Sequence, residues 1–276
     1  MTTTATAPST EGVADGAEDP RAATPDAGSA AGRRRGPFPR GLVAAPFVLA
    51  TLAVLLRFYV VGYDKDFIET SALGWESNLL PQIRQHLALT GWSTLWVLLI
   101  AIPLGVVLTR PSFRKVSGAF LTVANSGQAL PAYGLFVVLF MWQGRGTRTA
   151  ILALVIFTVL PVLRNTMVGL DQVSADVIES ARGMGMTRLK ILQRIELPLA
   201  VPVILAGVRT ALVINVGMAA LATFIGGGGL GDTINSGLSN NRELVTLTGA
   251  GLTALVALTV DWLAAVAERI LRPRGL

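Results

Sequence analysis

The 276-residue chain contains no cysteine and a single histidine, His86. Without cysteine there is no disulfide framework and no thiolate chemistry. One histidine leaves almost nothing for a zinc site, and His86 lies in PQIRQHLALT beside no nucleophile motif, so no Ser-His-Asp arrangement is indicated. We interpret His86 as an interfacial residue at the edge of a membrane span. These absences argue against a membrane-embedded enzyme.

Charged residues are also scarce. Only 14% of the residues are charged, 52% are hydrophobic, and the mean hydropathy is +0.59. This composition is too apolar for a soluble globular domain and predicts an integral membrane protein. Several apolar runs reach the roughly twenty residues that a helix needs to cross a bilayer.

Neither the lysines nor the glycine-rich stretch of this sequence indicates a nucleotide-binding site. A phosphate-binding P-loop needs Gly-Lys followed by Ser or Thr. The lysines here follow aspartate, arginine and leucine; they are Lys65, Lys115 and Lys190. The glycines at 226–231 match GxGxxG, but they follow a long apolar run and not a short strand. We therefore expect no nucleotide site there, but a flexible turn at the external end of a span.

Hydropathy predicts an all-α, polytopic fold with about six transmembrane helices. The spans lie at residues 41–61, 87–108, 116–142, 149–168, 199–225 and 244–266. Polar residues and Pro131 interrupt the third span and are expected to loosen it at mid-depth. The uncharged stretch of the fourth span stops at Arg164, which we place at the membrane interface.

These spans divide the chain into four regions. Residues 1–36 have scarcely a large apolar side chain and are predicted to form a disordered cytoplasmic tail. Residues 37–85 hold the first span and an external loop, residues 86–268 the transmembrane domain, and residues 269–276 a cytoplasmic C-terminal tail. Basic residues concentrate at the span ends on the N-terminal side, which predicts a multi-pass protein of the plasma or inner membrane with both termini cytoplasmic.

One polar segment lies between the fourth and fifth spans. Residues 179–198 have the sequence ESARGMGMTRLKILQRIELP. An apolar-periodic stretch opens at Glu179, is interrupted at Gly185, and is followed by a second stretch that ends at Pro198. The pattern predicts two short cytoplasmic helices joined at the glycine, with a narrow apolar face suited to the groove of a partner.

The spacing of this segment resembles a known family pattern. Glu179, Ala181, Gly185, Ile195 and the pair Leu197-Pro198 keep the spacing of the EAA loop in membrane subunits of binding-protein-dependent ABC importers, which are type I permeases. Ser180 is the one departure, since alanine is usual there. Residues 179–198 are called the EAA segment below.

The resemblance implies how transport is driven. The EAA loop of that family is a pair of coupling helices seated in a separate ATPase subunit, which binds ATP and Mg²⁺, so this chain itself would hold no cofactor or metal. The other implied partners are a second permease subunit, identical or different, an extracytoplasmic substrate-binding protein and the lipid bilayer, with no nucleic acid. The ATPase-coupling candidates are Glu179, Ala181, Arg182, Gly183, Met184, Gly185, Met186, Ile195, Leu197 and Pro198.

Further stretches narrow the resemblance. ANSGQALPAYGL, LPVLRNTMVGLDQV and LPLAVPVILAGVRTALVINVGMAALATFIGGGGLGDTI are similar to permeases of the osmoprotectant uptake group, which implies glycine betaine, choline or carnitine as cargo. The alternative is a permease for amino acids or another small solute. A stand-alone channel or a membrane-embedded enzyme fits less well, because neither uses the EAA segment.

Polar groups inside the spans are candidates for the translocation path, because exposing them to lipid is costly. Asn215 could either line the path or hydrogen-bond a neighbouring helix. Arg209 is interpreted as a cytosolic-side anchor or a buried gate charge, and Asp261 as the partner of some basic group. Aromatic faces in the spans could contact a quaternary ammonium cargo. The path candidates are Asn125, Gln128, Pro131, Tyr133 and Asn215.

Overall fold

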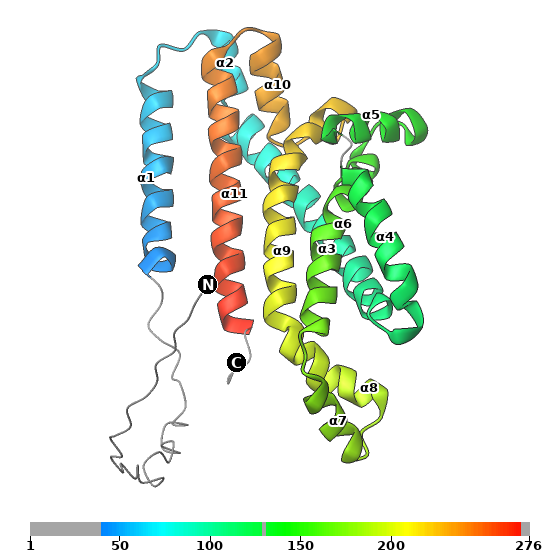
Figure 1. The fold of residues 1–276 in the computed structure, drawn as a ribbon. Helices are drawn as coiled ribbons and strands as arrows, with labels where there is room; N and C mark the ends of the chain where they lie inside the picture. Colours follow the sequence, from blue (N-terminus) through cyan, green and yellow to red (C-terminus); the bar gives the residue numbers. More distant parts are fainter. Residues whose placement is uncertain (1–39, 129–130, 272–276) are drawn as a thin grey trace, which may run out of the picture. The chain divides into compact units, whose positions relative to one another are not determined.

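The computed structural model describes residues 40–128 and 131–271, and every regular element in this part of the chain is helical. The predicted tail at 1–36 and residues 272–276 of the predicted C-terminal tail lie outside the described residues. The helices and helical turns in chain order (Figure 1) are α1 (Arg40–Gly62), α2 (Phe67–Ala72), η1 (Trp75–Leu79), α3 (Leu80–Leu108), η2 (Pro111–Phe113), α4 (Arg114–Gln128), α5 (Ala132–Gln143), α6 (Thr147–Asp171), α7 (Ala175–Gly183), α8 (Arg188–Ile191), η3 (Leu192–Glu196), α9 (Leu197–Ala219), η4 (Ala220–Ile225), α10 (Gly231–Ser239) and α11 (Glu243–Leu271).

Five helices in the described residues are long and apolar enough to cross a membrane. They are Leu42–Gly62, Trp75–Leu108, Thr147–Asp171, Arg188–Ile225 and Glu243–Leu271. These match the first, second, fourth, fifth and sixth predicted spans, and most extend further than hydropathy indicated. The fourth continues past Arg164 to Asp171, because one exposed charge does not end a helix whose backbone hydrogen bonds continue.

The third predicted span is not one helix. It is divided into α4 and α5, and α5 is too short to cross a bilayer alone. Pro131 immediately precedes α5 and has an extended backbone, with ψ at 131°. Proline lacks the N–H that a continuing helix would use, so the chain turns there. The predicted break is correct, whereas the prediction of a single span is wrong. Figure 1 shows α5 lying across the end of the bundle at which α4 arrives.

The packed centre consists of α3, α6 and α9. Their buried side chains form the main apolar clusters, which include Leu163 and Val97. Glycines let these helices approach closely. A Cβ at Gly105 of α3 would lie 2.7 Å from the methyl group of Thr166 on α6, and a Cβ at Gly207 of α9 would lie 2.6 Å from Cβ of Asn165 on α6. Small residues at helix contacts are the usual means of close packing in membranes.

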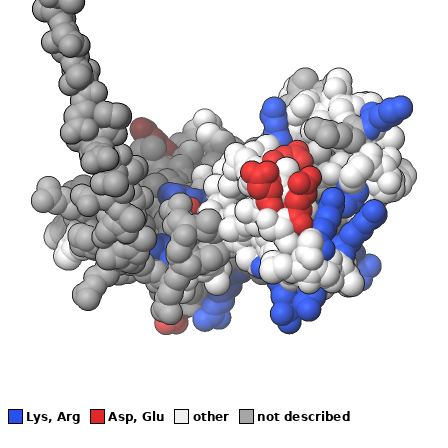
Figure 2. Space-filling model, turned by 60° about the horizontal axis from the view of Figure 1, so that its bottom comes forward, with Lys and Arg blue, Asp and Glu red and all other residues white. Residues whose placement is uncertain are grey.

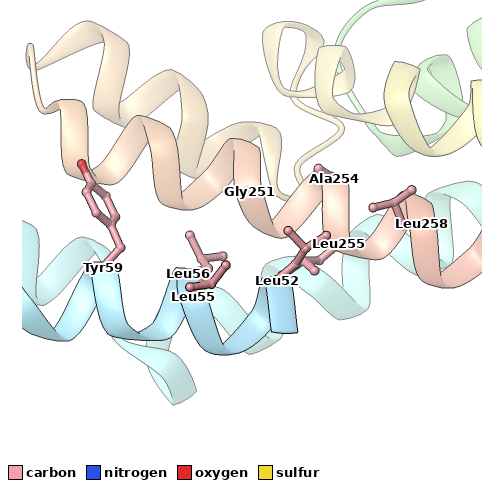
Figure 3. Close-up of a pocket in the computed structure, with 8 residues that line it drawn as sticks. All are labelled: Leu52, Leu55, Leu56, Tyr59, Gly251, Ala254, Leu255 and Leu258. Atoms are coloured by element: carbon pink, nitrogen blue, oxygen red, sulfur yellow. The ribbon is translucent and has the colours of Figure 1, made fainter. Parts of the chain in front are cut away.

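The first helix, α1, packs chiefly on α11. The indole nitrogen of Trp262 on α11 donates to the carbonyl of Leu42 at 2.9 Å, and Leu56 lies over Gly251, where an added Cβ would be 3.0 Å from its Cδ1. The two helices enclose an apolar groove of about 330 Å³ (Figure 3), lined by five leucines together with Tyr59, Gly251 and Ala254. Much of α1 faces outward, as expected for a helix bordered by lipid.

The loops gather at two opposite ends of the bundle (Figure 1). One end carries α7 and α8 and is called the EAA end. The other carries α2, α5 and α10 and is called the distal end. Helices α4 and α5 together return the chain from the EAA end to the distal end. The chain therefore still passes between the two ends six times, as predicted, although only five of these passages are single long helices.

Candidate functional site

The first half of the EAA segment is a helix closed by a glycine turn. Helix α7 ends with Met186 N donating to Ala181 O at 3.1 Å and Gly185 N donating to Arg182 O at 2.9 Å. This is the hydrogen-bond pattern of a Schellman cap, which requires a left-handed residue. Gly185 supplies it with φ at 78°. The predicted turn at Gly185, with helical residues on both sides of it, is therefore confirmed.

The second half of the EAA segment is not a separate helix. Helix α8 begins after Thr187, whose side chain accepts a hydrogen bond from Lys190 N. It continues through the π-helical turn η3 into α9, so 188–225 is one continuous helical rod. We expected the segment to end at Pro198, but Pro198 lies in the first turn of α9. The wider π turn just before it accommodates the missing N–H, so the helix continues.

The coupling candidates divide into two groups by exposure. Ala181 is fully buried, and Met186, Ile195, Leu197 and Pro198 are half-buried, so these five hold the segment against the bundle. The others are exposed on the surface of the chain: Glu179, Arg182, Gly183, Met184 and Gly185.

The exposed surface of the EAA end combines apolar and charged side chains. Met184 is 73% exposed and Leu189 62%, which are high values for apolar side chains on a folded surface. Figure 2 shows acidic side chains grouped on this end with basic side chains around them. The exposed charged residues of 171–194 are Asp171, Asp176, Glu179, Arg182, Arg188, Lys190 and Arg194. Such a surface can dock against a partner through apolar contact and oriented charges.

A salt bridge that the sequence did not indicate lies beside this segment. Arg110, just after α3, donates to both carboxylate oxygens of Glu196 at the end of η3, at 2.6 and 3.3 Å. Glu196 is buried. The two residues are 86 positions apart in the sequence. The one signal available in the sequence was Glu196 itself, a charged residue in the largely apolar stretch ILQRIELP, which suggests a basic partner.

Asn215 lies at the centre of the bundle. It is fully buried, its amide nitrogen donates to Thr94 Oγ1 at 3.0 Å, and its amide oxygen accepts from Thr158 Oγ1 at 3.1 Å. Asn215 thus joins α9 to α3 and α6. This position agrees with the alternative that Asn215 hydrogen-bonds neighbouring helices. Because the side chain is fully buried within this chain, it is not available to line a path.

The other path candidates lie around the break between α4 and α5. Asn125 and Pro131 are exposed, whereas the side chain of Gln128 lies outside the described residues. The ring of Tyr133 packs edge-to-face on Phe224 of η4, with centroids 5.4 Å apart. Both rings are about half exposed. Phe136, one turn along α5, is fully buried in the core and is therefore excluded from such a path.

Arg209 and Asp261 form an ion pair between α9 and α11. Arg209 donates to both carboxylate oxygens, at 2.6 and 2.8 Å. The predicted basic partner of Asp261 is thus identified as Arg209. The structure thus adds a specific partner to both interpretations of Arg209, because its guanidinium is held by a carboxylate of the neighbouring helix.

His86 and the glycine turn also differ from expectation. His86 is fully buried and not interfacial; Nε2 lies 2.9 Å from Val216 O, and Nδ1 accepts from Leu230 N at 3.3 Å. Gln85 donates to Gly227 O at 3.1 Å and accepts from Gly229 N at 3.2 Å. The turn is therefore fastened to α3 and is not free. The available signal was a group of polar residues on one turn of the helix, Gln82, Gln85 and His86.

No metal site is apparent in residues 40–128 and 131–271, where histidine, aspartate and glutamate form no cluster of three that could hold an ion. The groups described above are instead suited to joining helices and to presenting a docking surface. Together they define a subunit of the membrane whose helical bundle continues without a break into its EAA end.

Comparison with solved structures identifies this architecture. The fold is similar to a chain of the inward-facing MetNI methionine ABC transporter, with a TM-score of 0.63 and 23% identity, over 71% of this chain and 96% of that chain. The fold is thus that of a type I ABC importer permease.

Sequence comparison identifies the family. Residues 101–273 match the model of the family described as binding-protein-dependent transport system inner membrane component. The carnitine transport permease protein OpuCD of Listeria monocytogenes is 38% identical over 75% of this chain and 91% of its own length. The choline transport system permease protein OpuBB of Bacillus subtilis is 39% identical over 76% of this chain and 94% of its own length. The chain belongs to this family of ABC transport permeases.

Proposed function

We propose that the chain is a permease subunit of an ATP-driven importer for small osmoprotectants such as glycine betaine, choline or carnitine. The observation that carries this proposal is the similarity over 85–94% of the length of permeases whose names specify carnitine, choline and glycine betaine. The likeness to the methionine transporter, at 23% identity, supports the fold and gives no preference for amino acids.

A separate ATPase is the proposed source of energy. It would bind ATP and Mg²⁺ and seat its groove on the exposed part of the EAA segment, around Met184 and Leu189. The absence of a Gly-Lys-Ser/Thr sequence in this chain supports a separate subunit. A second permease subunit and an extracytoplasmic binding protein complete the proposed complex.

The proposed orientation places the EAA end in the cytoplasm of the cell membrane, together with both termini. The basic residues after α3 and in α8 support it by the positive-inside bias. In this arrangement residues 86–268 form the transport domain, and α1 with the following loop is an additional element on its border. Because the chain has no native cysteine, single-cysteine variants such as Arg188→Cys and Ser239→Cys can be labelled selectively. A membrane-impermeant maleimide should reach position 239, and not 188, from outside intact cells.

Transport assays in proteoliposomes test the function. The subunit would be reconstituted with its proposed ATPase and binding-protein partners, and uptake of labelled glycine betaine, choline, carnitine and methionine would be measured with ATP inside the vesicles. We expect ATP-dependent uptake of at least one quaternary ammonium compound and none of methionine. Uptake that persists without ATP would instead indicate a channel or a secondary transporter.

A further inference from the structure

The ion pair of Arg110 and Glu196 joins the end of α3 to the helical rod 188–225, two parts of the molecule that are far apart in the sequence. Glu196 belongs to the helical rod that begins at the EAA segment, and Arg110 follows the last residue of α3 by two positions. We propose that Arg110 and Glu196 are positioning residues that transmit movement of the EAA segment to α3. This inference rests on the proposed function, since it presupposes an ATPase that moves the segment.

The contact is built to hold its geometry. Two guanidinium nitrogens of Arg110 face the two oxygens of Glu196, at 2.6 and 3.3 Å, and the third, Nε, donates to Val106 O at 3.1 Å. A bidentate pair fixes orientation as well as distance. The bond to Val106 ties the arginine to the last turn of α3, so displacement of the carboxylate displaces the helix end and not merely a flexible side chain.

The end of α3 favours the same arrangement. Arg110 lies just beyond the C-terminal end of α3, where the exposed carbonyls carry partial negative charge. The positive charge of Arg110 is therefore favourable at this helix terminus and also toward Glu196. Glu196 is only 7% exposed, so its charge depends on Arg110 and not on water.

The rod explains why a link to α3 is needed. A displacement at α8 reaches α9 directly, because α8, η3 and α9 are continuous. Helix α3 precedes the rod by about eighty residues of chain, and its other described polar links to α9 lie further along: Asn215 with Thr94, and His86 with Val216. The Arg110–Glu196 pair fastens the end of α3 closest to the moving segment.

The test is the ratio of solute imported to ATP hydrolysed by the reconstituted complete complex. We expect Arg110→Met and Glu196→Gln to retain the ATPase in the purified complex and to lower this ratio by about threefold or more, as ATP is hydrolysed without full movement of α3. Arg110→Lys keeps one of the two bonds, so its ratio of solute imported to ATP hydrolysed should lie between the ratios of these two variants and that of the unaltered protein. The charge-exchanged protein, Arg110→Glu with Glu196→Arg, should recover part of the ratio.

Lys115→Met is the matched control, because Lys115 is an exposed cation five residues after Arg110, in the first turn of α4. The ratio of solute imported to ATP hydrolysed should be unchanged in this variant. If uptake and hydrolysis fall in parallel in the Arg110 and Glu196 variants, or if their ratio equals that of the control, the pair is merely structural and the proposal is wrong. Failure of the proposed function would look different, since the unaltered complex would then show no ATP-dependent uptake at all.

Discussion

The guanidinium of Arg209 on α9 holds both carboxylate oxygens of Asp261 on α11, at 2.6 and 2.8 Å. Both residues lie well inside helices long enough to cross a membrane, and both side chains are about one-third exposed in this chain. Charges at such a depth are stable only when paired or hydrated. The pair therefore attaches α11, and α1 packed on it, to the central helices.

Removal of one member of this pair should destabilise the protein more than removal of both. We expect Asp261→Asn or Arg209→Met to lower the free energy of unfolding by about 1–3 kcal/mol, because the remaining group loses its partner. The double variant should recover part of this loss. Unfolding in detergent, followed by circular dichroism in a double-mutant cycle, measures the difference. An equal loss of unfolding free energy in the single and double variants would contradict this prediction.

Gly185 should be intolerant of a side chain although space is available. No heavy atom lies within 4 Å of an added Cβ, but φ is 78°, which costs other residues about 1–2 kcal/mol. We expect Gly185→Ala to loosen the Schellman turn and to weaken retention of the ATPase during purification, with a corresponding loss of uptake. Gly118→Ala on α4, which also meets no atom within 4 Å but has an ordinary helical φ, is the control and should behave as the unaltered protein.

Acid should selectively weaken the distal end. Asp66 caps α2 and forms an ion pair with Arg242 at 2.6 Å. The hydrogen bond from the Glu69 amide, assisted by Arg242, lowers the pKa of Asp66 below its ordinary value of 3.8. A carboxylate with a lowered pKa stabilises the folded state above the unfolded value, and this contribution is lost as the pH falls below 3.8 toward the folded value.

The melting temperature should therefore differ between the unaltered protein and Asp66→Asn near neutral pH, and the difference should shrink as the pH falls below about 4. Thermal unfolding in detergent across this range measures the effect. A difference that is independent of pH would show that the charge of Asp66 does not contribute.

Tyr133 should matter for transport through its aromatic face and not its hydroxyl. The ring is half exposed and packs edge-to-face on Phe224, and we predict that it contacts a quaternary ammonium solute. We expect Tyr133→Leu to lower the uptake of glycine betaine by roughly two- to tenfold, the range of a cation–π contact of about 0.5–1.5 kcal/mol. Tyr133→Phe should transport normally. Normal transport by Tyr133→Leu would remove Tyr133 from the path.

The sequence predicts well whatever depends on local composition. Apolar runs identify the five long helices, since burial in lipid depends on length and hydropathy alone. Gly185 predicts the turn of the EAA segment because a left-handed residue is a local requirement. Pro131 predicts a break, but not that α5 lies across the bundle end, because the direction of a helix after a break depends on what it packs against.

Pairing between distant residues was not predictable in the same way. Arg110 with Glu196, and Asn215 with Thr94 and Thr158, depend on the depth and rotation of separate helices, which hydropathy does not encode. His86 was misplaced for the same reason. Its neighbours in sequence describe a helix end near the interface, whereas its hydrogen-bond partners lie more than a hundred residues later, Val216 in α9 and Leu230 in the glycine turn.

The fastening of α3 to α9 restricts the kind of motion that can open and close this subunit. Polar links join the two helices near the EAA end, at mid-depth through Asn215 and Thr94, and at the distal end through His86. Three attachment points along the two helices oppose sliding of either helix past the other. We therefore expect α3 and α9 to tilt together during transport, with bending confined to the connections that carry no such links.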